Sequence, residues 1–262
     1  MIESQFRIVA HGGAGSNNDH SDGAQKAVED GKALLQEGQT ALDAVCKAVE
    51  TLENDGRFNA GVGSMRRSES SVQMDASCMD STNRYGAVAV LEGYRNPIFV
   101  ARSILESPLT LLAGAGAAEF ALKKNFRSWS GQGRLPDKGA CSDTVGAVAF
   151  DGETFAAALS TGGTGNAPIG RVGDVPLLGC GLYAGPDGAV AATGHGESIT
   201  INMTAYRVYQ MLTRGTDPNI ALKTCLHWFD DKTDIGLILV SRKGMSGGSN
   251  RSMAWARNVG SE

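Results

Sequence analysis

The chain has 262 residues, a formal net charge of −4 and an apolar fraction of 42%. This length suits one large α/β domain, and the apolar fraction is enough for a core, which excludes global disorder. The acidic balance and scattered Lys and Arg residues argue against a nucleic-acid surface, which would show a basic stripe. No apolar run is long enough to cross a bilayer, and the first residues do not resemble a secretory leader, so we expect a cytoplasmic protein without a membrane partner.

Cysteine and glycine limit the class of protein further. The five cysteines are far apart and form no CxxC pair, so we expect reduced thiols and neither a zinc site nor a disulfide framework. The 35 glycines exceed the usual share of about 7% and cluster with Thr, Asn and Asp. This clustering predicts backbone brought close to a small polar ligand. Neither GxGxxG nor a P-loop occurs, so we expect no organic cofactor.

The first half of the chain contains patterns of both strands and helices. A buried strand over residues 6–10 leads into a glycine-rich turn, and a helix follows over 22–37. The next helix begins after Thr40, whose side chain can cap it, with Asp43 completing an arrangement like a capping box. Further along the chain we expect a strand over 85–91 and helices near 100–105 and 115–124.

The second half follows a linker over residues 125–143, where glycine, proline and polar residues predict a loop that a protease can reach. Strand patterns then cover 144–150, 155–160, a segment before Thr193, 235–241 and 253–257, and helical patterns cover 199–214 and 218–229. Helices and strands come in blocks, without strict βαβ alternation. This order predicts stacked sheets with helices outside.

Thr144 opens a strand directly after the linker. A threonine hydroxyl inside a chain is a poor nucleophile, whereas at a chain terminus the α-amine, with a reference pKa of about 8, can take its proton. Such chemistry requires a cut between Asp143 and Thr144, which the same hydroxyl can make by attacking the preceding carbonyl. The local sequence alone favours the simpler interpretation, a threonine that merely starts a strand.

A glycine-rich loop after the second of these strands carries Thr161, Arg171 and Asp174. Thr161 can hydrogen-bond to a neighbouring nucleophile. The planar fork of Arg171 suits a carboxylate, and Asp174 can take an ammonium group, so together they would read both ends of an α-amino acid. A structural ion pair between Arg171 and Asp174 is the alternative.

Another glycine turn begins at Thr193, whose hydroxyl and the adjacent backbone N–H groups can form an oxyanion hole. His195 in this turn is either a base or a helix cap, and a terminal threonine would supply its own base. Two other segments leave alternatives open. The turn after His11 can cradle an anion, and the loop over 58–64 can hold a monovalent cation, with Asp75 as a brace, or is simply a structural glycine turn.

In this order, the motifs resemble those of the plant-type asparaginase and isoaspartyl peptidase family, N-terminal nucleophile hydrolases related to glycosylasparaginases. The resemblance covers nearly the whole chain through seven motifs, which are His11-Gly12-Gly13-Ala14-Gly15, Phe58-Asn59-Ala60-Gly61, Met74-Asp75-Ala76, Thr144-Val145-Gly146-Ala147-Val148-Ala149, Ser160-Thr161-Gly162-Gly163, Gly170-Arg171-Val172-Gly173-Asp174 and Ala192-Thr193-Gly194-His195-Gly196-Glu197. It implies an α+β fold of the four-layer αββα sandwich type. It also implies one domain over residues 1–262, cut into 1–143 and 144–262.

On the matching positions, the resemblance implies hydrolysis of L-asparagine, of β-aspartyl dipeptides, or of both. The implied catalytic residues are the nucleophile Thr144, its hydrogen-bonding partner Thr161, and the oxyanion-hole residues Thr193 and Gly194. The implied substrate contacts are Arg171 for the α-carboxylate, Asp174 for the α-amine, and the glycines Gly194 and Gly196. Asn59, Gly12 and Gly13 would support this site. The family further implies a homodimer of processed units and a structural sodium ion in a loop that includes Asn54, Phe58, Ala60 and Gly63.

Two features leave other functions open. Asp143 before the nucleophile resembles the glycosylasparaginase branch, which makes a glycosylasparaginase-like amidase the second hypothesis. The linker is shorter than in typical family members, which gives less slack for self-cleavage. An uncut, non-catalytic protein that binds an amino acid is therefore the third hypothesis.

Overall fold

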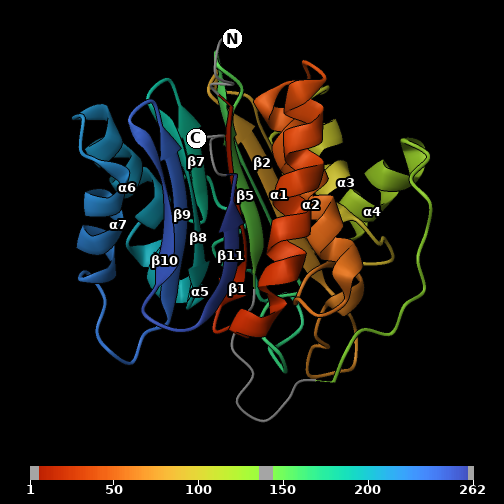
Figure 1. The fold of residues 1–262 in the computed structure, drawn as a ribbon. Helices are drawn as coiled ribbons and strands as arrows, with labels where there is room; N and C mark the ends of the chain where they lie inside the picture. Colours follow the sequence, from red (N-terminus) through yellow and green to blue (C-terminus); the bar gives the residue numbers. More distant parts are fainter. Residues whose placement is uncertain (1–5, 136–143, 259–262) are drawn as a thin grey trace.

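The computed structural model describes residues 6–135 and 144–258, which form two β-sheets lying face to face with helices on their outer faces (Figure 1). The seven-stranded sheet has the order β11-β1-β5-β6-β2-β3-β4, and the four-stranded sheet has the order β10-β9-β8-β7. This mixed α/β content with two sheets confirms the expectation of stacked sheets. In the described part of the chain, no helix is long and apolar enough to cross a membrane.

Strands from both sides of residue 143 share the larger sheet. Its members are β1 (Arg7–Ala14), β2 (Met74–Asp80), β3 (Tyr85–Leu91), β4 (Leu111–Ala113), β5 (Val145–Phe150), β6 (Phe155–Thr161) and β11 (Met253–Arg257). β5 pairs antiparallel with β1, and β6 pairs antiparallel with β2. β11 also pairs antiparallel with β1, so a cut before Thr144 would leave the two pieces joined by three ladders of backbone hydrogen bonds.

The smaller sheet contains β7 (Leu182–Gly185), β8 (Gly188–Gly194), β9 (Ile235–Ser241) and β10 (Gly244–Ser249). The space between the sheets is filled by apolar side chains from both, among them Val9, Val148, Leu159, Leu182 and Ile238. Alternate residues of a strand face opposite sides of its sheet, so one face of β6 lines this inner layer and the other faces the helices.

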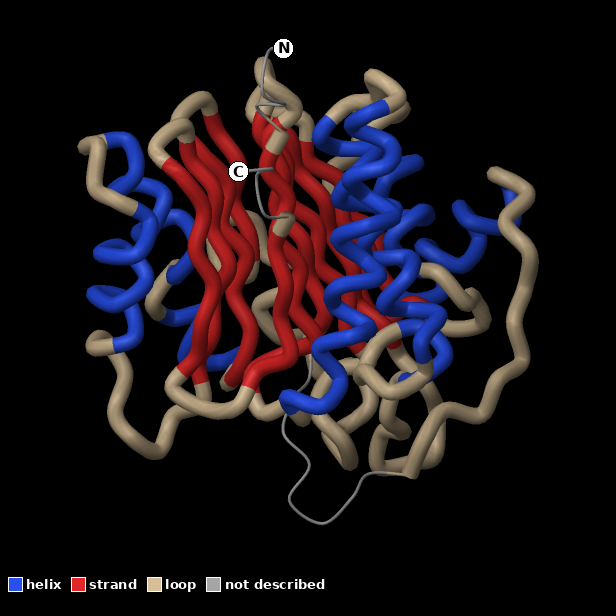
Figure 2. Tube along the Cα trace, viewed as in Figure 1, coloured by secondary structure: helices blue, strands red, loops and turns tan. Residues whose placement is uncertain are grey.

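Helices cover the outer face of each sheet (Figure 2). The larger sheet is covered by α1 (Ser21–Gln36), α2 (Ala41–Asp55), α3 (Pro97–Ile104) and α4 (Gly114–Lys123), and the smaller one by α5 (Gly196–Ile201), α6 (Thr204–Thr213) and α7 (Pro218–Leu226). The N-terminus of α2 is confirmed as predicted, because Thr40 and Asp43 form a reciprocal capping box. Gly56 ends this helix at a φ of 77°, a conformation that glycine adopts readily.

The prediction of one helix over residues 199–214 is wrong. The chain forms two helices there, because Met203 between them adopts a left-handed conformation with φ 46°. The hydroxyl of Thr204 donates to the carbonyl of Ile199 at 3.1 Å, which satisfies an acceptor at the end of α5. The sequence predicted neither β7 nor β10. β7 has only four residues and β10 contains three glycines, so periodicity is a poor signal in both.

Candidate functional site

The candidate site lies where β5 begins and β6 ends. Val145 pairs with Ser160, so Thr144 stands at the next position, beside Thr161. On the other side of β6, Asp75 pairs with Thr161. Residues opposite one another on antiparallel strands share a face, so these three polar side chains form a row on the face that looks toward the second sheet. The side chain of Thr144 is buried, with 4% of the residue exposed.

Asn59 fixes the loop that follows Thr161. Its Nδ2 donates to the carbonyl of Gly163 at 2.6 Å, and its own carbonyl accepts from the Gly162 N–H at 2.9 Å. Its Oδ1 accepts from the Met65 N–H at 2.8 Å. The buried Asn59 side chain therefore joins its own loop, at Met65, to the backbone after Thr161, at Gly163.

Thr193 and Gly194 end β8 in the second sheet. The hydroxyl oxygen of Thr193 accepts from the Ala14 N–H at 3.1 Å, so its own proton is available to donate elsewhere. Gly194 has φ 134°, and a β-carbon there would overlap the carbonyl of Asp234, so only glycine fits. This arrangement suits an oxyanion hole, with the glycine-rich end of β1 supporting Thr193.

The two glycines predicted to support the site lie in this same segment. Gly12 packs directly on the Phe58 ring, which leaves no room for a side chain. Gly13 has φ 110°, and its carbonyl accepts from the backbone and the hydroxyl of Ser16. Both glycines therefore allow close approach of the backbone.

Arg171 and Asp174 come together at Gly196. A β-carbon on Gly196 would lie 2.8 Å from Nη2 of Arg171 and 3.0 Å from Oδ1 of Asp174, so both charged groups reach the same backbone. The sequence left a structural ion pair between them as an alternative. Arg171 instead forms its ion pair with Glu197, from Nε to Oε1 at 2.9 Å and from Nη2 to Oε2 at 2.8 Å. Glu197 had no predicted role, although it stands next to Gly196.

Two buried carboxyl groups at the site, those of Asp174 and Asp75, have raised pKa values and would be stabilised in their ionised form by a cation. Burial raises the pKa of Asp174 to about 7, and its Oδ2 has no hydrogen-bond partner among the described residues. Burial likewise raises the pKa of Asp75 to about 6, although the Val90 N–H, which donates to Oδ1 at 2.8 Å, opposes this shift. An ammonium group near Asp174 would supply the missing donor and stabilise its ionised form.

Arg67 is a buried residue of the site that the sequence did not indicate. Its guanidinium packs against Gly163, where a β-carbon would lie 2.5 Å from Nη1. Nη2 donates to the carbonyl of Gln73 at 3.0 Å. Burial lowers the pKa of Arg67, and the negative charge of Asp75 opposes this effect. Arg67 lies in a serine-rich stretch whose composition is typical of a solvated loop. The sequence pattern therefore did not indicate that this arginine is buried.

Two histidines contribute to the frame of the site. His195 caps α5, because its Nδ1 accepts from the Ser198 N–H at 3.3 Å and contacts the Ser198 hydroxyl at 2.8 Å. This confirms the cap in preference to the base. His11 is fully buried, which lowers its pKa to about 3 despite an opposing contact with the Thr144 backbone. A β-carbon on Gly146 would lie 2.5 Å from Nε2 of His11, so this neutral ring fills the space beside β5.

The loop expected to hold sodium fits this role only in part. The carbonyls of Phe58 and Ala60 accept backbone N–H groups, and each keeps a second lone pair. The carbonyl of Gly63, however, accepts from Nε of Arg134 at 2.8 Å, which places a positive charge where the ion would bind. Gly63 is therefore a poor ligand, and Asn54, Phe58 and Ala60 stay a prediction. The described residues contain no cluster of His, Cys, Asp and Glu that could hold a metal.

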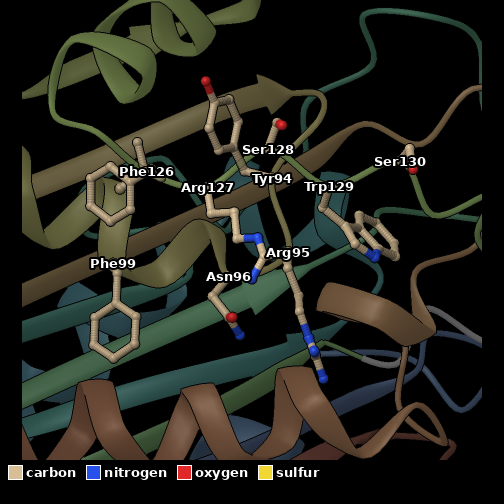
Figure 3. Close-up of a pocket in the computed structure, with 10 residues that line it drawn as sticks. Tyr94, Arg95, Asn96, Phe99, Phe126, Arg127, Ser128, Trp129 and Ser130 are labelled. Atoms are coloured by element: carbon tan, nitrogen blue, oxygen red, sulfur yellow. The ribbon is translucent and has the colours of Figure 1, made fainter.

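A cavity of about 530 Å³ lies on another part of the molecule, between the start of α3 and the segment 126–130 (Figure 3). It is lined by Tyr94, Arg95, Asn96, Phe99, Val100, Phe126, Arg127, Ser128, Trp129 and Ser130. None of these residues belongs to the row of Thr144, Thr161 and Asp75. None belongs to the pair of Arg171 and Asp174 either, which we call the amino-acid clamp. Asp143, the other half of the predicted cleavage site, lies outside the described residues.

Comparisons with known proteins agree with these motifs. The profile of the family described as asparaginase matches residues 4–138 and 127–262. The isoaspartyl peptidase/L-asparaginase of Rattus norvegicus is 36% identical, over 97% of this chain and 86% of its own length. The protein of the same name from Homo sapiens is 37% identical over 95% and 92%, respectively. The plant-type L-asparaginase of Pyrococcus abyssi is 34% identical over 92% and 91%.

Proposed function

Because this chain belongs to the asparaginase family, we propose that it hydrolyses the side-chain amide of L-asparagine and the isopeptide bond of β-aspartyl dipeptides. The observation that carries this proposal is the meeting of Arg171 and Asp174 at Gly196. A cation and an anion held by one backbone turn match the carboxylate and the ammonium of an α-amino acid. Thr144 and Thr161 provide the hydroxyl groups. Asp75, which lies in the same row, interacts with Arg171 and with the Gly173 backbone.

Self-cleavage is the proposed first step. The hydroxyl of Thr144 attacks the carbonyl of Asp143, an ester forms, and the peptide bond between them breaks. Water then hydrolyses the ester, which leaves a carboxylate on Asp143 and a free α-amine on Thr144. The amine can now accept the hydroxyl proton, so the terminal threonine becomes an activated nucleophile.

Substrate hydrolysis then follows two half-reactions. The Thr144 oxygen attacks the side-chain carbonyl of the bound substrate, and the Thr193 hydroxyl and the Gly194 N–H stabilise the oxyanion. Ammonia or an amino acid leaves with the proton that the α-amine held, and an ester to Thr144 remains. Water hydrolyses this ester and releases aspartate.

The finer architecture belongs to the same proposal. The fold would be the four-layer αββα sandwich of N-terminal nucleophile hydrolases, formed as one domain over residues 1–262. Cleavage would divide it into 1–143 and 144–262, and two processed units would form a homodimer. The two helix-covered sheets are compatible with this architecture.

Cleavage and turnover are tested together. Incubation should convert the 27.3 kDa chain into pieces of about 15 and 12 kDa, in proportion to their lengths. The smaller piece should begin with Thr-Val-Gly on N-terminal sequencing. The Thr144→Ala variant should stay uncut and release no ammonia from asparagine. Hydrolysis by this variant would disprove the mechanism, and rates on glycosylasparagine measured alongside would show whether the related branch fits better.

A further inference from the structure

Glu197 occupies one edge of the Arg171 guanidinium. The pair is bidentate, with distances of 2.9 Å from Nε and 2.8 Å from Nη2. Arg171 is largely buried, with 15% of its side chain exposed, whereas 53% of the Glu197 side chain is exposed. A guanidinium has five N–H donors on two usable edges, so the edge that includes Nη1 is left for a second carboxylate.

Asp174 is a competing partner for Arg171. Nη2 of Arg171 and Oδ1 of Asp174 lie 2.8 Å and 3.0 Å from the position that a β-carbon on Gly196 would take, so an arginine released from Glu197 would face this carboxylate across the same turn. Such an ion pair would use up both groups that the zwitterionic substrate needs. The buried carboxyl of Asp174, with one oxygen unpartnered among the described residues, would favour that pairing strongly.

We propose that Glu197 is a positioning residue that keeps the amino-acid clamp open. By holding Nε and Nη2, it turns the guanidinium away from Asp174 and presents the remaining edge to the substrate α-carboxylate. This inference rests on the proposed function, because it assigns Arg171 and Asp174 to the two ends of the substrate. Glu197 directly follows Gly196 and lies in α5, so the turn that carries Gly194 also places the carboxylate that orients Arg171.

Charge balance supports a positioning role for Glu197. Arg171 lowers the pKa of Glu197, so the glutamate is ionised and neutralises the arginine before substrate binds. Gly173 and Gly196 approach the guanidinium closely, which leaves Arg171 few other orientations while Glu197 holds it. Once the glutamate is removed, Asp174, whose Oδ1 approaches Gly196 beside Nη2 of Arg171, is in place to form the ion pair that blocks the site.

The experiment compares Glu197→Ala with a double variant that removes the competing partner. Succinamate, which is asparagine without its α-amine, is the probe because it needs Arg171 and not Asp174. We expect Glu197→Ala to raise KM for asparagine and succinamate about tenfold, with kcat within about twofold, which corresponds to one lost oriented contact. Adding Asp174→Asn should restore the KM for succinamate to within about threefold of wild type. The neutral amide cannot form an ion pair with Arg171, so the guanidinium stays available to the substrate carboxylate.

Glu119→Ala is the matched control, because it also removes a glutamate from an ion pair, with Lys123 on the surface of α4, and should change nothing. An unchanged KM in Glu197→Ala, or a double variant as poor as the single one toward succinamate, would overturn the inference while the proposed function stands. If the wild-type protein hydrolyses neither asparagine nor a β-aspartyl dipeptide, the proposed function fails and this inference fails with it.

Discussion

The Asn59 side chain is joined to the Gly163 main chain by a hydrogen bond of 2.6 Å between Nδ2 and the carbonyl oxygen. Asn59 lies before residue 143 and Gly163 lies after it, so the proposed cut would leave this bond intact. Thr161 stands two residues before Gly163 and receives the Gly163 N–H on its hydroxyl at 3.0 Å. Asn59 therefore holds the loop that positions Thr161 from the other proposed subunit.

Asn59→Asp should lower kcat about tenfold or more and change KM little. The carboxylate cannot donate to Gly163 and would repel its carbonyl, so the loop at Thr161 would shift, whereas Glu197 holds the clamp separately. Steady-state kinetics with asparagine would measure this split. Asn258→Asp is a matched control, since Asn258 also donates to one carbonyl, that of Phe6, and accepts from one N–H, that of Ile8. A loss of kcat in both variants would indicate a general effect on stability.

Aspartate binding should strengthen as pH rises through about 7. Burial raises the pKa of Asp174 to about 7, and only its ionised form can bind the ammonium of an amino acid. Below this pH the group is protonated, so affinity falls; above it, affinity reaches a plateau. Equilibrium titration separates this effect from the α-amine of Thr144, which has a reference pKa of about 8 and affects kcat.

Succinate, which is aspartate without its α-amine, is the internal control for this pH dependence, because it has no ammonium group and should bind with little change between about pH 6 and pH 8, where ordinary carboxyl groups are ionised. The Asp174→Asn variant should bind aspartate weakly at every pH in this range. A wild-type affinity for aspartate that is independent of pH would contradict the role of Asp174.

Sequence patterns predicted the strands and helices of this protein more accurately than they predicted which charged side chains are buried. The bounds of β3, β9 and β11 are confirmed without change, and the Thr40 capping box is confirmed, because periodicity and capping are local signals. Thr144, Arg171 and Asp174 were identified by the chemistry of their motifs and by the family resemblance, and their chemical roles stay predictions. The break at Met203 and the pairing of Arg171 with Glu197 depend on tertiary contacts that no local pattern contains.

Glu53 shows the same limit of a local pattern. Glutamate is seldom fully buried, yet Glu53 in α2 is fully buried and accepts from the Ile98 N–H at 3.1 Å and from Asn96 at 3.0 Å. Burial raises its pKa to about 8. The helix α3 and the loop before it close over this carboxyl, and they come more than 40 residues later in the chain.

Arg67→Met should destabilise the fold by about 1–3 kcal/mol at neutral pH, because it removes one of the two positive charges, Arg67 and Arg171, that oppose the desolvation of the buried Asp75 carboxylate. The double variant Arg67→Met/Asp75→Asn should recover much of this loss, since the buried carboxylate is then gone. Chemical denaturation of the four proteins of this double-mutant cycle would measure the coupling.

The pH dependence gives a second readout of Arg67. The pKa of Asp75 is raised in the folded protein to about 6, so this group contributes stability at low pH that is lost as pH rises through about 6. Without Arg67 that pKa should rise further, and the loss of stability should continue to higher pH. If Arg67→Met were as stable as wild type across this range, the electrostatic link between the two residues would be refuted.

Gly12→Ala should destabilise the protein through a single steric overlap. A β-carbon on Gly12 would run into the ring of Phe58, which is fully buried and cannot move aside, and overpacking of this kind costs about 1–3 kcal/mol. In a Phe58→Leu background the smaller side chain leaves room, so the same substitution should cost less, with a coupling of about 1–2 kcal/mol. Gly116→Ala in α4 is the control, since nothing lies within 4 Å of its β-carbon, and alanine should stabilise a helix by about 0.5–1 kcal/mol there. Equal costs of Gly12→Ala in both backgrounds would show that the Phe58 ring is not what excludes a side chain at this end of β1.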